Sequence, residues 1–226
     1  MAQSVTSFVY FKVKPSVKPE EPGNKEGEGL LGVFRAFKNE SGHASSAWGR
    51  TVEDNDTIVL VIDWSDARGS ITTAYLEPFL ASTPQPPTVL YTTLQPAVSA
   101  TDTLTKNPVT ELCAFPFPSN MTVSEVKELN ADLINFRKAL IEQLPQAEGP
   151  RSWTMGHVDR PGQVEHKKSP SGEAVMRFLA VGWDSVETHK KAKETEQFAK
   201  SIAPIRQKML PPVPGLELRH VSFQKT

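Results

Sequence analysis

Two stretches of this chain have an apolar pattern that predicts strands buried on both faces. Thr57–Trp64 reads TIVLVIDW and Met176–Trp183 reads MRFLAVGW. Both faces of each stretch are largely apolar, so we expect these strands to lie inside a sheet that is covered on both sides. The second stretch runs into a predicted helix, in which Asp184 is the expected N-cap and Glu187 its capping-box partner.

The two stretches are copies of one repeated unit. Each ends in a tryptophan followed by hydroxyl and acidic residues, and Trp183 follows Trp64 by 119 residues. His189 shares a helical stripe with apolar neighbours three residues away on either side. The corresponding position in the first copy is Ser70. The chain is therefore predicted to have two similar halves, of which only the second carries this imidazole.

The rest of the first half completes the element order β-α-β-β-α-β. Its other strands are predicted at Val5–Val13, Ser45–Val52 and Thr88–Leu94. A short amphipathic helix is expected at Leu30–Lys38, and a second helix, kinked at Pro78, is expected to end near Ser82. The polar segment Lys14–Gly29 is expected to be an exposed connection.

The second half repeats this order. Its other strands are predicted at Val109–Phe117, Ser152–Val158 and Leu216–Phe223. A long helix is predicted to begin with a capping box formed by Thr122 and Glu125. A polar loop at 159–173 has no counterpart in the first half.

The composition of the chain narrows its class. The 26 acidic and 25 basic residues nearly cancel, which argues against nucleic acid or an anionic membrane surface as the partner. No apolar run is long enough to span a bilayer. The single cysteine excludes an internal disulfide and fits a reducing cytosol. We expect a cytoplasmic protein with an N-terminal repeat at 1–95, a linker at 96–108 and a C-terminal repeat at 109–226.

The two halves are expected to cover one another. A four-stranded sheet with helices on one face leaves its other face bare, and here the strands are apolar on both faces. The sheets are therefore predicted to face each other within the chain and form a barrel-like core.

Three segments carry a family resemblance: WGRTVED (48–54), VLVIDWSD (59–66) and FLAVGWDSVETH (178–189). They resemble the dimeric α+β barrel superfamily, and within it the antibiotic-biosynthesis-monooxygenase-like branch. The resemblance implies an α+β fold of two ferredoxin-like repeats that form within one chain the pair most members form by dimerisation. A monomer is then expected, with higher assembly left open. In this superfamily a histidine in this region is an acid/base in polyketide cyclases and an iron ligand in haem-degrading members.

Two histidines are the candidate catalytic residues. His189 lies on an inward helical stripe, and histidine titrates in the range where general acid/base catalysis is useful. His157 shares one strand face with Trp153 and Met155. By alignment of the two halves, His157 falls opposite Arg50 in a shared cavity. The alternative for each histidine is an ordinary structural residue.

Six residues are candidates for binding the substrate: Arg50, Trp153, Met155, Arg177, Trp183 and His220. A buried arginine needs a partner, and a substrate anion is one option. The other two histidines, His43 and His166, are expected to be surface residues of loops. The sequence has no HxH, CxxC, HExxH or GxGxxG spacing, so neither a metal nor a nucleotide cofactor is expected.

Three function classes remain open. The first is a cofactor-free enzyme that uses histidine acid/base chemistry to cyclise, isomerise, eliminate from or decarboxylate a small polyketide-like or aromatic molecule. The second is a cofactor-independent monooxygenase that deprotonates a phenolic substrate for reaction with oxygen. The third is a non-catalytic, stress-responsive or ligand-binding barrel. The first class is favoured because it requires only one well-placed acid/base.

Overall fold

The computed structural model describes residues 4–66, 68–82, 85–98 and 103–226. The elements of the first half are β1 (Val5–Lys12), α1 (Lys25–Ala36), η1 (Phe37–Asn39), β2 (His43–Arg50), β3 (Thr57–Trp64), η2 (Thr73–Phe79) and β4 (Thr88–Gln95). The elements that follow are α3 (Thr103–Lys106), β5 (Val109–Pro118), α4 (Val123–Lys138), the π-helical turn η3 (Ala139–Gln143), β6 (Ser152–Arg160), β7 (Val164–Glu165), β8 (Glu173–Trp183), α5 (Val186–Glu194), α6 (Glu196–Lys208), β9 (Arg219–Val221) and β10 (Gln224–Lys225).

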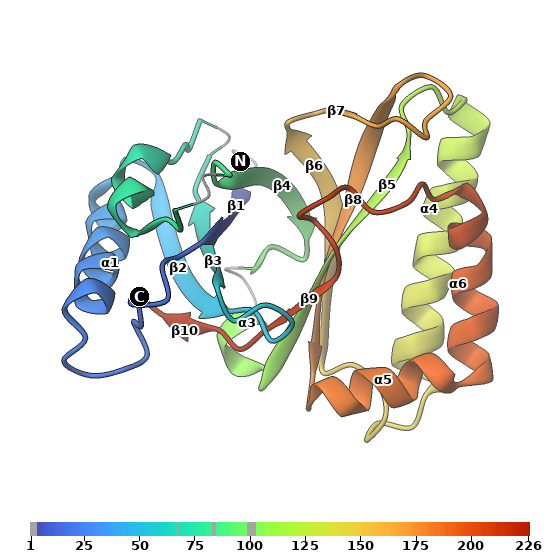
Figure 1. The fold of residues 1–226 in the computed structure, drawn as a ribbon. Helices are drawn as coiled ribbons and strands as arrows, with labels where there is room; N and C mark the ends of the chain where they lie inside the picture. Colours follow the sequence, from blue (N-terminus) through green and yellow to red (C-terminus); the bar gives the residue numbers. More distant parts are fainter. Residues whose placement is uncertain (1–3, 67, 83–84, 99–102) are drawn as a thin grey trace.

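The strands form one antiparallel sheet that contains two copies of the ferredoxin-like strand order. The order is β2-β3-β1-β4 in the first half and β6-β8-β5-β9 in the second, and β4 pairs with β6. The C-terminal segment joins the other two edges, because β9 pairs with β5 and β10 pairs with β2 (Figure 1). The result is an α+β barrel built from two βαββαβ halves, as predicted from the sequence. The expected monomer and the exact repeat boundaries stay predictions.

The inside of the barrel is packed with apolar side chains from both halves. Phe8 of β1 and Phe178 of β8 meet with their ring centroids 4.3 Å apart. Leu90, Leu112 and Met176 are buried in the same cluster. Close packing of this kind holds the two halves together by burial of apolar surface.

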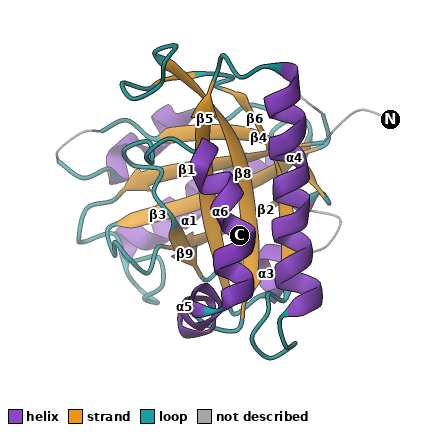
Figure 2. Ribbon diagram, turned by 90° about the vertical axis from the view of Figure 1, so that its right-hand side faces the viewer, coloured by secondary structure: helices purple, strands orange, loops and turns teal. Residues whose placement is uncertain are grey.

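Helices cover the outer face of each half. In the first half, α1 packs Leu30 and Phe34 against the β3 strand. In the second half, α4 and α6 lie side by side over the sheet and α5 crosses near its lower edge (Figures 1 and 2). α4 begins with the predicted capping box, in which Thr122 and Glu125 bond to each other's backbone. The outer layer of the second half therefore has two long helices where the first half has one.

The first helix starts earlier than the pattern predicted. α1 begins at Lys25, and the side chain of Asn24 accepts a hydrogen bond from the backbone N–H of Gly27. The predicted exposed connection at 14–29 is shorter for that reason, and it includes the buried Val17. Glycines at 27, 29 and 32 lower helix propensity and hid the start of the helix.

Two further helix predictions need correction. The predicted second helix of the first half is the 3₁₀ segment η2, with Pro78 inside it. The N-cap of α5 is Ser185, whose hydroxyl accepts from the backbone N–H of Thr188, while the predicted cap Asp184 pairs with Arg151. Helix α6 was not predicted, because Pro204 interrupts its sequence pattern.

The connections also differ from expectation in places. The predicted linker at 96–108 contains the short helix α3, and its residues 99–102 lie outside the described residues. The loop at 159–173 contains β7, which pairs with β8. His166 was predicted to be exposed and is buried, with Nε2 2.9 Å from the backbone oxygen of Pro211. Across the described ranges, every helix is too short or too polar to cross a bilayer.

Candidate active site

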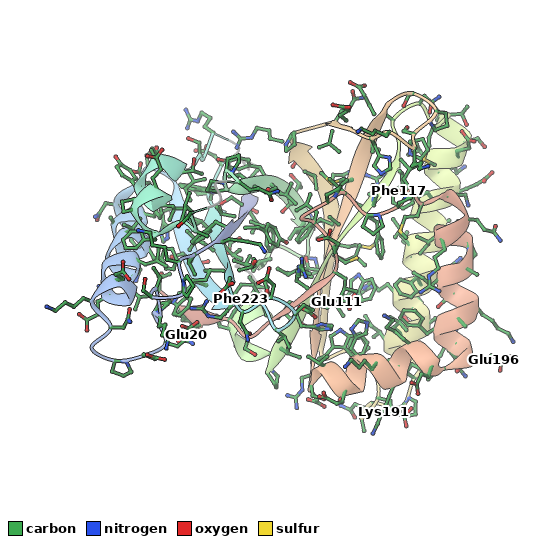
Figure 3. The ribbon with its side chains drawn as sticks, viewed as in Figure 1. Glu20, Glu111, Phe117, Lys191, Glu196 and Phe223 are labelled. Carbon is green, nitrogen blue, oxygen red and sulfur yellow. The ribbon has the colours of Figure 1, made fainter. Side chains whose placement is uncertain are left out.

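A small cavity lies in the second half, between the outer face of the sheet and the helices. Its volume is about 100 Å³, and we call it the inner cavity. Its sheet side includes Glu111 of β5 and Trp153 of β6, and its helix side includes His189 of α5 and Phe198 of α6. Figure 3 labels Glu111 where the sheet faces this helical layer, whereas Phe223 is labelled on the side of the first half. The inner cavity is therefore separate from the packed inside of the barrel.

A tryptophan fixes Glu111 and His189, the acid and the imidazole that line the inner cavity. The indole Nε1–H of Trp183 donates to Oε2 of Glu111 at 3.0 Å. The ring of His189 stacks on the same indole with centroids 4.8 Å apart and planes 18° apart. This stacking leaves His189 Nε2 at 3.4 Å from the same Glu111 oxygen. One indole thus sets the position of both the carboxyl group and the imidazole.

The polar contacts continue from His189 to the surface. Nδ1 of His189 lies 2.8 Å from Nε2 of His220, and Nδ1 of His220 lies 2.5 Å from Oε1 of Glu53. The other oxygen of Glu53 accepts from the backbone N–H of His220 at 2.9 Å. We call Glu53, His220, His189 and Glu111 the polar chain. It begins on a partly exposed carboxylate of the first half and ends on a buried carboxyl group of the second.

Local structure explains why these side chains point inward. Along β5, Glu111 alternates in step with the buried Val109 and Cys113, so it faces the helices and not the barrel interior. In α5, the cap at Ser185 sets the helix phase, and His189 shares the buried stripe with Ala192. The apolar surroundings that bury these strand and helix faces also bury their polar residues.

Burial moves the pKa values of the polar chain in opposite directions. It raises the pKa of Glu111 to about 7, although the hydrogen bond from Trp183 lowers it. It lowers the pKa of His189 to about 3, with added repulsion from His220 and Lys193. Burial acts to raise the pKa of Glu53, but the hydrogen bonds from His220 outweigh it and lower the pKa overall. At neutral pH, His189 is a neutral imidazole beside a carboxyl group that titrates near neutrality.

The structure divides the predicted site residues into two neighbouring places and one distant one. His189 and Trp153 line the inner cavity, His220 belongs to the polar chain, and Trp183 contacts both Glu111 and His189. Met155, His157 and Arg177 line an adjoining open groove of about 480 Å³ under α4, which we call the outer groove. The two hollows share Leu179 as a lining residue.

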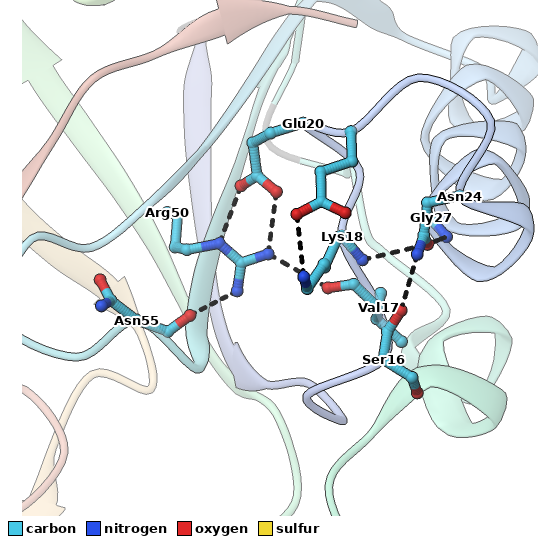
Figure 4. A network of polar contacts seen from close by, with 9 residues as sticks. Ser16, Val17, Lys18, Glu20, Asn24, Gly27, Arg50 and Asn55 are labelled. Atoms are coloured by element: carbon cyan, nitrogen blue, oxygen red, sulfur yellow. Dashed lines mark hydrogen bonds and ion pairs between the residues drawn. The ribbon is translucent and has the colours of Figure 1, made fainter.

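Arg50 is the distant residue. Its guanidinium forms an ion pair with Glu20 at 2.8 Å and donates to the backbone oxygens of Asn55 and Val17 (Figure 4). These contacts tie the connection before α1 to β2. The structure therefore does not bring Arg50 and His157 into one cavity, contrary to the expectation from aligning the two halves.

The sequence reasoning missed two members of the polar chain. Glu111 gave a signal, because an acidic residue on the apolar face of a strand is rare unless it has a partner. Glu53 gave none, since it lies in a polar turn after β2 and meets His220 across 167 residues of sequence.

The surroundings of His189 do not fit a haem, which some members of the superfamily that this sequence resembles bind. Both ring nitrogens of His189 face protein groups, and its ring face lies on Trp183. A cavity of about 100 Å³ is smaller than the roughly 150 Å³ that encloses a benzene molecule. Within the described ranges, no group of three or more His, Cys, Asp or Glu side chains is placed to hold a metal ion.

Comparison with known proteins gives matches in structure alone. No protein-family model matches the chain, and no curated protein matches it significantly in sequence. A candidate chlorite dismutase is 11% identical over 99% of this chain and 95% of its own, with a TM-score of 0.63. An anthrone oxidase-like protein is 12% identical over 99% and 93%, with a TM-score of 0.61. A candidate monooxygenase from Lactobacillus acidophilus NCFM is 8% identical over 98% and 94%, with a TM-score of 0.55.

These matches extend over nearly the whole of each chain, so they show the fold. The curled antiparallel sheet with helices outside it is the dimeric α+β barrel architecture, here with both halves in one polypeptide. At identities of 8–12% the likeness carries no information on chemistry.

Proposed function

We propose that this protein is an enzyme that moves protons to and from a small apolar or aromatic molecule whose reacting end lies beside Glu111 and His189. The reaction class is cyclisation, isomerisation, elimination or decarboxylation, as expected from the sequence. The substrate is proposed to be of the polyketide-like or aromatic type, within the antibiotic-biosynthesis-monooxygenase-like branch of the superfamily. No resident cofactor takes part in this proposal.

The observation that carries the proposal is the polar chain that ends at the inner cavity. Replacing buried charged groups by apolar ones of similar size is often neutral or stabilising, so a purely structural layer between sheet and helices does not need them. Here a buried carboxyl group is held with a pKa of about 7, which suits a general acid/base at neutral pH. Its neighbour His189 connects it to Glu53, which is partly exposed.

The contacts define two protonation states that hold the same number of protons. In the first, Glu111 is protonated, His189 and His220 each carry their proton on Nδ1, and Glu53 is ionised. In the second, the Glu111 proton has passed to Nε2 of His189, and the Nδ1 proton of His189 has passed to Nε2 of His220. His220 is then an imidazolium beside the Glu53 carboxylate. The exchange needs only that His189 Nε2 and Glu111 close from 3.4 Å to hydrogen-bond distance.

This exchange gives each residue a role. In its ionised state Glu111 takes a proton from the bound molecule, and in its protonated state it returns one. His189 passes the proton on, and His220 holds the resulting positive charge, which Glu53 stabilises through the 2.5 Å contact. Trp183 keeps the carboxyl oxygen in place throughout.

Proton exchange from carbon tests this proposal without knowledge of the natural substrate. The protein is incubated in deuterium oxide with a panel of small ketones, β-keto acids and phenols, and loss of the acidic C–H signals is followed by NMR. We expect accelerated exchange that falls about 10²–10⁴-fold in Glu111→Gln and in His189→Gln. His166→Gln, which alters another buried histidine, is the matched control and should exchange at the wild-type rate.

Two results would count against the proposal. Exchange that is equally fast in Glu111→Gln and His189→Gln would remove the polar chain from the chemistry. A compound that binds the inner cavity without any exchange would favour the non-catalytic binding protein.

A monooxygenase that acts without a cofactor is the second candidate. The same Glu111 would deprotonate a phenol, and the resulting anion would react with oxygen in a site closed to water. Its support is that structural neighbours are described as monooxygenase candidates and as anthrone oxidase-like. Oxygen uptake on addition of phenols, lost in Glu111→Gln, would favour this candidate over the first.

A further inference from the structure

The outer groove contains a cation without an acidic partner. Arg177 Nη1 lies 3.0 Å from Nε2 of His157, and Arg177 Nη2 donates to Oδ1 of Asn130 at 3.1 Å. Both partners are neutral when His157 accepts this bond, and no ion pair with Arg177 occurs in the described part of the chain. A guanidinium has five N–H donors, so several stay open to an anion.

One residue that lines the inner cavity has a donor without an acceptor. Trp153 is 5% exposed and lines the inner cavity. Its indole N–H is the one buried side-chain polar atom without a hydrogen-bond partner in the part of the chain that the structure describes. An unpaired buried donor destabilises the protein, and a bound acceptor would remove that cost.

Arg177 and Trp153 lie in line on the same face of the sheet. His157 pairs with Arg177 and Trp153 pairs with Val181, so the two levels are four residues apart along β6 and β8. At about 3.3 Å per residue, this separation is about 13 Å. Met155 and Leu179 lie between the two levels, and Leu179 lines both hollows. The path from the open groove to Glu111 is therefore apolar, with a cation at its outer end.

We propose that the substrate of this site is an elongated amphipathic carboxylic acid with a carbonyl or hydroxyl oxygen at its far end. Arg177 binds its carboxylate, and its apolar body runs under α4 past Met155 and displaces the Leu179 side chain. Trp153 donates its free N–H to the distal oxygen, which then lies in the cavity that Glu111 and His189 line. This inference rests on the proposed function, because it gives the molecule on which Glu111 acts.

The size of the two hollows agrees with this orientation. The inner cavity, at about 100 Å³, has room for the end of such a molecule, whereas the outer groove, at about 480 Å³, has room for its carboxylate end and chain. The inner cavity has two cations of its own, Lys193 and Arg206, among its lining residues. A molecule bound in the reverse direction would place its carboxylate there, so the experiment has to separate the two directions.

Binding of three probes of equal chain length tests the proposal by calorimetry. The probes are ω-hydroxydecanoate, decanoate, which lacks the distal oxygen, and decanol, which lacks the carboxylate. We expect the wild-type protein to bind ω-hydroxydecanoate more tightly than either of the other two. Arg177→Gln should weaken binding of both carboxylates about 10–100-fold and leave decanol unchanged. Trp153→Phe keeps an aromatic ring but removes the N–H, and should weaken only ω-hydroxydecanoate, to the affinity of decanoate.

Arg206→Gln is the matched control for charge and should leave the preference for carboxylates unchanged. The proposal is overturned if Arg177→Gln leaves that preference unchanged, if decanol binds as tightly as decanoate, or if none of the probes binds. In those cases the proposed function stands as long as small ketones still exchange in a Glu111-dependent manner. Conversely, binding as expected together with exchange that does not depend on Glu111 would leave this inference standing and refute the proposed function.

Discussion

The two halves of the molecule differ in the groups that surround their equivalent tryptophans. Trp64 of β3 and Trp183 of β8 occupy equivalent positions, opposite Val5 and Val109 in the sheet register. Trp64 donates its indole N–H to the hydroxyl of Ser7 at 3.0 Å. The equivalent bond from Trp183 goes to a carboxyl group at position 111 instead.

The ring faces of the two tryptophans differ as well. The Trp183 ring is covered by the stacked imidazole of His189. The Trp64 ring is covered by backbone at Gly69, where an added Cβ would overlap the indole. The first half thus closes over its tryptophan with neutral groups, and the second half places an acid and a base there. One architecture therefore supports both a structural layer and a candidate active site, and only a few residues decide which.

The largest loss of stability is expected when the first half is given a carboxyl group at the position equivalent to Glu111. Ser7→Glu would place a carboxyl group where Ser7 is fully buried and where no imidazole is stacked on the tryptophan. Such a group costs about 3–5 kcal/mol at pH 8, less when it is protonated at pH 5. Urea unfolding at both pH values measures this, with Ser7→Ala as control for loss of the Trp64 hydrogen bond. A loss below about 1 kcal/mol at pH 8 would mean that the first half can hold a charge as well.

The next largest effect is expected from removing the charge of Glu111. Its native pKa of about 7 lies above the unfolded value, so the stability it contributes is present below pH 4.5 and lost as the pH rises through 7. Glu111→Gln keeps the acceptor for Trp183 and does not ionise. The variant should be more stable than the wild type at pH 8, by up to about 3 kcal/mol, and equal to it near pH 4.

Urea unfolding from pH 4 to pH 8 gives the free energy of unfolding of the wild type and of Glu111→Gln. The difference between the two isolates the contribution of Glu111. His189 contributes with the opposite sign, because its lowered pKa makes stability fall as the pH drops below 6.5. That contribution is common to both proteins. A difference that does not change with pH would show that the carboxyl group titrates in its ordinary range.

A smaller loss of stability is expected at Gly69, whose backbone covers Trp64 in the way that the imidazole of His189 covers Trp183. Gly69→Ala would force a methyl group against the ring of Trp64, at a cost of about 1–3 kcal/mol. Gly32→Ala on α1 is the control, since its Cβ meets no neighbour and should be neutral or stabilising by up to about 1 kcal/mol. Equal thermal stability of Gly69→Ala and the wild type would show that Trp64 is loosely covered.

The smallest effect is expected at the exposed end of the polar chain. Glu53→Gln keeps an acceptor for the His220 backbone but loses the charge, at a cost of about 1 kcal/mol at neutral pH. The pKa of Glu53 is lowered in the folded protein, so this loss should disappear as the pH falls through that native pKa. Unfolding measured from pH 7 down to the lowest pH at which the protein is folded checks this. A loss of equal size over the whole range would assign it to packing.

Much of the fold follows from the sequence because the barrel depends on short-range patterns. The apolar pattern of MRFLAVGW predicted a strand covered on both faces, and the structure buries Met176 and Phe178 inside the barrel and Leu179 under the helices. The capping box at Thr122 fixed the start of α4. The pattern missed two helical segments, the first turn of α1 and the whole of α6. The first contains glycines and the second contains a proline, and packing against the sheet outweighs their low helix propensity.

The candidate site is less accessible to sequence reasoning because it depends on contacts between distant segments. His189 could be selected from its helical stripe, and its burial confirms that orientation. The hydrogen-bonded network around it could not be predicted, because Glu53 and His220 are 167 residues apart and meet only when the C-terminal segment closes the barrel. Aligning the halves placed His157 opposite Arg50, but local ion pairing with Glu20 holds that arginine elsewhere.

The protonation of Glu111 at neutral pH is the most direct test of the account. Infrared difference spectra between pH 5 and pH 9 report protonated carboxyl groups in the folded protein, and subtraction of the Glu111→Gln spectra isolates one of them. We expect a single carboxylic acid that deprotonates with a midpoint near pH 7 and is absent from the variant. Identical spectra for the two proteins above pH 5.5 would mean that Glu111 is fully ionised there, and the polar chain would then have no proton to give or take at neutral pH.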